Sequence, residues 1–125
     1  MGHKVHIPYI TQKIIDGEVL YEEYMRAKEK SGDISIRRSQ PVDMIRRYWN
    51  LIKDSDAVLV LNLKKKGIDG YIGGNTLMEM GFAHGHGKKI FLFNPIPERC
   101  ERMHYVDEIL DMKPVVINGN LGNIK

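Results

Sequence analysis

Cysteine and long apolar runs are scarce in this sequence. Its 125 residues contain a single cysteine, Cys100, which excludes an internal disulfide framework and fits a reducing, cytoplasmic environment. The longest apolar run, AVLVLNL at 57–63, is far too short to cross a bilayer. The N-terminus shows no charged-then-apolar leader, so we expect neither a signal peptide nor a membrane partner.

Length and charge set further limits. A chain of this size is expected to form one domain, 1–125. The formal net charge is only +3, and the basic residues include short clusters at 37–38, 46–47 and 64–66. Such clusters are typical of solvated surface, with attraction to a phosphate-bearing ligand as the alternative. No nucleic-acid partner is expected.

Apolar patterning predicts strands that alternate with helices. The expected strands are 3–9, 57–63, 89–95 and 114–118, and the expected helices are 18–30, 42–53, one starting near Thr76, and 104–112, with a loop over 33–41. This order is typical of an α/β fold with three layers and a parallel sheet, here of four strands. Ligands in such folds bind at the carboxyl ends of strands, so the loop 62–75 is the expected site.

Four glycines, at 67, 70, 73 and 74, allow this loop to turn sharply and to approach a ligand closely. The helix that follows points its N–H groups toward the same space, which favours an anion. The nucleotide motif G-x-G-x-x-G is absent here, and GHGKK at 85–89 lacks the Ser or Thr of a P-loop. We interpret Gly85 and Gly87 as residues that end the helix. His84 and His86 lack metal-binding spacing, so no metal is expected.

One carboxylate, Glu79, has two interpretations. The stretch TLME, 76–79, matches a capping box, in which Thr76 caps the helix and Glu79 reaches back to the N–H of the cap residue. The flanking residues are apolar or small, so Glu79 could instead be a partly desolvated carboxylate that the helix N-terminus holds ionised. Such a group suits a nucleophile in glycosyl chemistry.

The segments SDAVLVLN at 55–62 and GGNTLMEMGFAHGHGKKIFLFNP at 73–95, joined by the glycine-rich loop, resemble the nucleoside 2-deoxyribosyltransferase superfamily. This superfamily includes deoxynucleoside-monophosphate N-glycosidases. The resemblance is strongest from Ser55 to Pro97. It implies a flavodoxin-like or Rossmann-like parallel sheet.

The resemblance also implies an activity. Glu79 would attack the anomeric carbon of a deoxyribonucleoside or its 5′-monophosphate, the base would leave, and water or a second base would take the sugar. No cofactor is implied. The resemblance does imply homo-oligomers, in which a neighbouring subunit contributes a polar side chain to the pocket. His104 and Tyr105 are the candidates for this side chain. Two family aspartates are replaced here by Gly73 and Tyr48, and Asp69 is then the nearest acid and the second catalytic candidate.

The substrate-binding candidates lie around the strand end: Asn62, Tyr71, Gly73, Gly74 and Asn75. Asn75 has an alternative as a turn residue. A nucleotide-binding module without catalysis and an inactive, shortened homologue remain the alternatives to an enzyme.

The resemblance places a further strand and helix before the segment MGHKVHIP, and this chain starts with that segment. We therefore expect strand 3–9 to pair beside 57–63, or another chain to fill the gap. In either case turnover should be weak, because one wall of the pocket would be missing. Tyr9 or Tyr71 could replace a tyrosine that positions the glutamate in the family.

Overall fold

A computed structural model describes most of the chain. The described residues are 2–7, 12–13, 15–17, 20, 22–23, 26 and 43–125. The chain divides into two compact units, 1–43 and 44–125, and each is considered by itself. The single domain expected from the sequence stays a prediction.

The first unit corrects one predicted strand. Residues 3–7 form no strand and are mostly exposed; the side chain of Val5 is 72% exposed. The alternation of polar and apolar residues does not by itself make a strand, and no strand of the described residues pairs with this segment. Residues 8–9, the loop 33–41 and most of the predicted helix 18–30 lie outside the described residues. Within that helix Glu22, Glu23 and Arg26 are helical, and Arg26 pairs with Glu22 at 3.5 Å.

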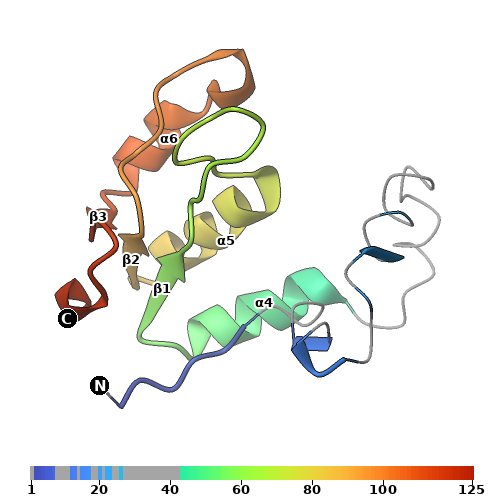
Figure 1. Cartoon of the computed structure of the whole chain (residues 1–125). Coiled ribbons are helices and arrows are strands. Elements are labelled where there is room, and N and C mark those ends of the chain that lie inside the picture. Colours follow the sequence, from blue (N-terminus) through green and yellow to red (C-terminus); the bar gives the residue numbers. More distant parts are fainter. Residues whose placement is uncertain are drawn as a thin grey trace. The chain divides into compact units, whose positions relative to one another are not determined.

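The second unit is built on a parallel sheet, which confirms the α/β class (Figure 1). Its strands are β1 (Ala57–Val60), β2 (Lys89–Leu92) and β3 (Val115–Val116), in the order β1-β2-β3. Val58 pairs with Ile90, and Leu92 pairs with both Val60 and Val116. The described residues thus contain three strands of this sheet, where the sequence predicted four.

Helices alternate with these strands as predicted. They are α4 (Met44–Lys53), α5 (Gly74–Gly85) and α6 (Val106–Asp111), with 3-10 turns η1 (Glu101–Met103) and η2 (Leu121–Asn123). The C-terminus of α5 confirms the predicted stop. The Gly87 N–H donates to the carbonyl of His84, the Lys88 N–H donates to that of Ala83, and Gly87 has φ +68°, which together form a Schellman motif.

One cluster of buried residues packs against one face of the sheet, and Phe91 is buried on the other face. Alternate strand residues point to the same face. Val60, Ile90 and Leu92 on that face join Met80 and Ala83 of α5, and Val106 and Ile109 of α6, in one buried cluster. The opposite face carries Leu59, Phe91 and Val115. Figure 1 shows α5 alongside the sheet with α4 next to it.

Membrane insertion through a helix finds no support among the described residues. None of the helices there combines the length and the apolar character that a bilayer crossing requires.

Candidate functional site

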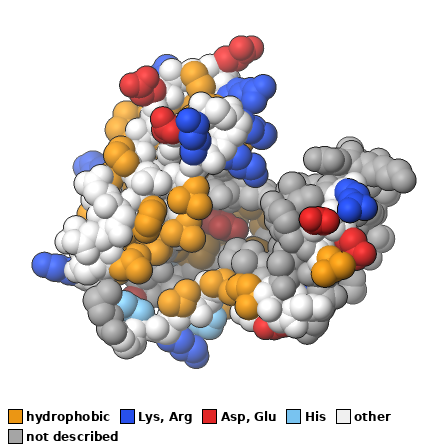
Figure 2. Space-filling model, in the orientation of Figure 1, with side chains coloured by type: hydrophobic (Ala, Val, Ile, Leu, Met, Phe, Trp, Pro, Cys, Tyr) orange, Lys and Arg blue, Asp and Glu red, His pale blue; other side chains and the backbone are white. Residues whose placement is uncertain are grey.

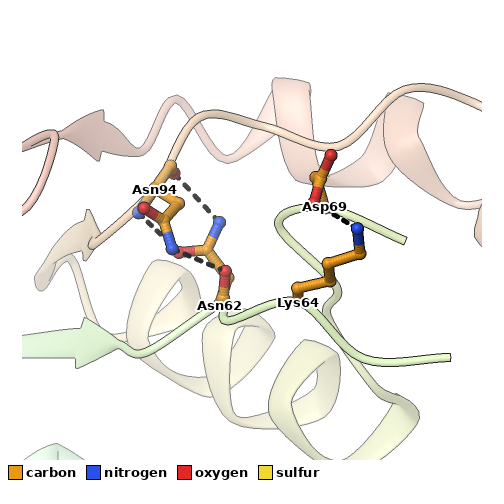
Figure 3. A network of polar contacts seen from close by, with 4 residues as sticks. All are labelled: Asn62, Lys64, Asp69 and Asn94. Carbon is orange, nitrogen blue, oxygen red and sulfur yellow. Dashed lines mark hydrogen bonds and ion pairs between the residues drawn. The ribbon is translucent and has the colours of Figure 1, made fainter. Parts of the chain in front are cut away.

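A groove lies at the carboxyl ends of β1 and β2, where the sequence predicted a site. It has a volume of about 670 Å³ and is lined by residues 64, 67–70 and 94–100. Asp69 is one of the lining residues, and its carboxylate lies 3.7 Å from the Lys64 ammonium (Figure 3). Both side chains are largely exposed, so this ion pair is weak and leaves both charges accessible to a ligand.

Asn62 connects the two loops that form the groove. Its side chain is 1% exposed. Its amide nitrogen donates to the carbonyls of Asn94 at 2.9 Å and Pro95 at 3.2 Å, and its amide oxygen accepts from the Asn94 N–H at 2.8 Å. The Asn94 amide returns a bond to the Asn62 carbonyl at 3.1 Å (Figure 3). Asn62 therefore positions the groove, and its expected contact with a substrate stays a prediction.

Gly70 is required where the two loops meet. Its φ is +71°, and a Cβ there would lie 2.6 Å from the carbonyl oxygen of Pro95. A side chain would suffer both the left-handed backbone strain and a collision with a backbone atom. Gly70 is thus a loop glycine at which another part of the backbone approaches closely, and the partner is the carbonyl of Pro95.

The N-terminus of α5 shows that the capping box is wrong. The cap residue is Gly73, with φ −81° and ψ 170°, and no side chain caps the helix. The Leu77 N–H donates to the Gly73 carbonyl at 2.9 Å. Thr76 is therefore already inside the first turn, and Glu79 lies in the second turn, beyond reach of the N-cap. Glycine satisfies the backbone geometry of a cap without the side-chain signal that sequence reasoning looks for.

Glu79 is half-buried, and burial raises the pKa of its carboxyl group. Among the described residues the carboxylate makes no hydrogen bond and no ion pair. The stabilisation expected from the helix N-terminus is weak at this position, because that effect falls off within the first turn. Glu79 is thus a partly desolvated acid with no evident structural task.

Glu79 shares a face of α5 with Phe82 and His86, since residues three and four apart lie above one another on a helix. Trp49 of α4 contacts this face: its ring centroid lies 5.0 Å from that of Phe82 and 4.4 Å from that of His86. Glu79 therefore belongs to the side of α5 that faces α4. It is not among the residues that line the groove, so the structure does not bring Asp69 and Glu79 into that one hollow.

Tyr105 and Tyr71 fix the loop before α5. The Tyr105 hydroxyl donates to the carbonyl of Ile72 at 2.5 Å, and its pKa is raised, first by burial and then by the nearby Tyr71 and Cys100. The Tyr71 ring lies 3.5 Å from the position of a Cβ on Gly73. Tyr105 thus serves its own chain, whereas a role in a neighbouring subunit stays a prediction for it and for the exposed His104.

Gly74 and Asn75 are exposed in the first turn of α5, and their contact with a ligand stays a prediction. Sequence reasoning missed the contribution of the segment 94–100, which supplies seven of the twelve residues that line the groove. The asparagine–proline pair at 94–95, which begins two residues after the end of β2, could have indicated it. In the described part of the chain, no three His, Cys, Asp or Glu residues are grouped so that they could hold a metal ion.

Comparisons with protein-family models, curated proteins and solved structures gave no significant match. The assignment of a function therefore depends on the residues and the geometry of this chain.

Proposed function

We propose that this protein cleaves or transfers the N-glycosidic bond of a nucleoside, a deoxynucleoside or the 5′-monophosphate of either, with Glu79 as the nucleophile. The state of Glu79 carries the proposal: a half-buried carboxylate with a raised pKa that neither caps its helix nor pairs with a described residue. Stability does not explain such a group, because desolvating an unpaired carboxylate costs free energy.

The chemistry follows from that environment. An ionised Glu79 would attack the anomeric carbon while the bond to the base breaks and the bonding electrons leave with the base. A carboxylate whose pKa is raised is more basic and hence more nucleophilic once ionised. Water then attacks the glycosyl ester, or a second base does, which returns Glu79 and releases the sugar product.

The groove supplies the second half of the proposed site. A nucleoside monophosphate is long enough to extend beyond one side chain. The Lys64 ammonium and the N–H groups at the start of α5 favour a phosphate. Asp69, which lines the groove, is the candidate that protonates the departing base. Tyr71, Gly73, Gly74 and Asn75 form the adjoining loop and first turn and would contact the sugar or the phosphate.

A second candidate function is nucleotide binding without catalysis. It is favoured by one observation: the groove contains Asp69 but not Glu79. A ligand held entirely within the groove would not meet the carboxylate that the reaction needs. The protein would then bind a nucleotide at the strand ends and leave it intact.

One experiment decides between catalysis and binding alone. Chromatography measures the free base released from deoxynucleosides and deoxynucleoside 5′-monophosphates. The wild-type chain should release base and Glu79→Gln should not. Glu108→Gln on the exposed side of α6 is the matched control, and its rate should equal that of the wild type. If no base appears but a nucleotide raises the melting temperature, the binding function is correct and the nucleophile proposal is wrong.

The three-layered, flavodoxin-like sheet with a fourth strand and the assembly into homo-oligomers belong to the same proposal. A fourth strand would pair with the open edge of β1.

A further inference from the structure

The groove at the strand ends has two walls that differ in charge. One wall is the loop after β1, which contributes Lys64 and Asp69. The other wall is the segment after β2, which contributes Glu98 and Arg99. Figure 2 shows acidic and basic side chains close together at the end of the second unit that carries the loop between β1 and α5. The charges that are still available on each wall decide which ligand the groove can select.

The first wall is basic. Lys64 is followed by Lys65 and Lys66, and all three side chains are exposed. Asp69 offsets one of these charges, since its carboxylate lies 3.7 Å from the Lys64 ammonium. The charge that remains on this wall is positive, and it favours the anionic part of a ligand, such as the phosphate of a nucleotide.

The second wall offers a carboxylate. Its cation is already engaged, because the Arg99 guanidinium pairs with Asp107. Glu98 is exposed, and within the described part of the chain its carboxylate makes neither a hydrogen bond nor an ion pair. An ionised carboxylate accepts hydrogen bonds and donates none. This wall therefore favours a part of the ligand that donates hydrogen bonds.

We infer that Glu98 selects nucleotides whose base carries an exocyclic amino group. The inference rests on the proposed function and specifies the substrate of that site. When the phosphate lies on the basic wall, the base extends toward the second wall, and its amino group donates to the Glu98 carboxylate. Glutamate makes the same contact with the amino group of cytosine in DNA recognition. Asp69, the candidate that protonates the base, belongs to the other wall and leaves the exocyclic edge to Glu98.

A keto group at the same position of the base has the opposite effect. Hypoxanthine and uracil carry a carbonyl oxygen where adenine and cytosine carry the amino group. The Glu98 carboxylate would then face a second acceptor and would lose a hydrogen bond to a charged group. Selection therefore comes both from a bond to the correct base and from repulsion of the wrong one.

The test compares matched nucleotides. Deoxyadenosine monophosphate is paired with deoxyinosine monophosphate, and deoxycytidine monophosphate with deoxyuridine monophosphate, because an amino group is exchanged for a keto group within each pair. Isothermal titration calorimetry of the whole chain with Glu79→Gln measures binding without the proposed turnover. The amino member of each pair should bind about tenfold more tightly, the scale of one hydrogen bond to a charged group. In the wild-type chain the same preference should appear in kcat/KM for base release.

Variants of the two walls separate their roles. Glu98→Gln should abolish the preference, because an amide both donates and accepts and so accommodates either base. Lys64→Gln should weaken the binding of all four nucleotides alike and leave the preference unchanged. Glu101→Gln is the matched control, since Glu101 is exposed nearby in the chain but does not line the groove, and the preference should persist in this variant.

The outcomes distinguish this inference from the proposed catalysis. Equal binding of the two members of each pair, or a preference that survives Glu98→Gln, would overturn the inference and leave the proposed catalysis intact. A preference in binding that depends on Glu98, without any release of base, would support the inference and overturn the catalysis. If none of the four nucleotides binds, the inference is wrong together with the nucleotide-binding function.

Discussion

Truncation of Asn62 to alanine should destabilise the protein strongly. The side chain is almost completely buried. Its amide makes three hydrogen bonds of 3.2 Å or shorter, all to backbone groups of Asn94 and Pro95. Alanine removes these bonds and leaves two carbonyls and one N–H without their partner.

The size of the effect follows from those bonds. Each contributes a net 0.5–1.5 kcal/mol or so, which gives a loss of about 2–4 kcal/mol for Asn62→Ala. The lower value applies if water enters from the adjoining groove and replaces some of the lost partners. Against a total stability of about 5–15 kcal/mol, either value is a large fraction. Asn62→Asp should cost more at neutral pH, because a carboxylate cannot donate to two carbonyls.

Urea unfolding followed by fluorescence of Trp49, the sole tryptophan, measures this loss, since Trp49 contacts Phe82 and His86 in the folded state. Asn75→Ala is the control: this asparagine is exposed, and its replacement should change the free energy of unfolding by less than about 0.5 kcal/mol. If Asn62→Ala loses less than about 1 kcal/mol, below the range expected for three such bonds, the connection between the loops is not what holds the groove.

Four further substitutions test other parts of the structure. Gly67→Ala should lower the free energy of unfolding by about 1–2 kcal/mol, because of its left-handed backbone alone. Gly70→Ala should lower it by about 1–3 kcal/mol more, because its Cβ meets the Pro95 carbonyl. Equal losses for the two variants in urea unfolding would contradict the clash with Pro95. Gly81→Ala, inside α5 with open space around its Cβ position, should raise the free energy of unfolding by about 1 kcal/mol, and a lower midpoint in urea would contradict the helix position assigned to it. Glu79→Gln should be more stable than wild type at neutral pH and lose this advantage in acid, as melting temperatures across a pH series would report.

The sequence predicted the elements of the second unit well because the apolar runs there coincide with burial. The run at 57–63 contains β1, the run at 89–95 contains β2, and Gly87 ends α5 where expected. The same reasoning failed at 3–7, since alternation is a necessary property of a half-buried strand but does not supply a partner.

The candidate site was predicted less completely. A groove lies at the predicted strand end, but the sequence does not reveal the bonds that Asn62 makes there. They join loops that are far apart in the sequence, with a separation of 32 residues between Asn62 and Asn94. The capping box at Thr76 was wrong because the actual cap, Gly73, uses its backbone alone. The bonds of Asn62 and the cap at Gly73 both involve the main chain, whose hydrogen bonds a one-dimensional pattern does not encode.

Glu79 joins these results into one argument about function. Its pKa is raised by burial, so its ionisation opposes folding: the stability associated with it is complete below the ordinary carboxyl pKa and is lost as the pH rises through the raised value. Glutamine at this position would serve the fold better at neutral pH. A Glu79→Gln variant that gains stability and loses base release would show that the carboxylate is there for chemistry, at the expense of the fold. A variant that gains stability and still releases base would exclude Glu79 as the nucleophile. A variant less stable than wild type at neutral pH would mean that the carboxylate has a binding partner in the folded protein, and the argument from its isolation would fail.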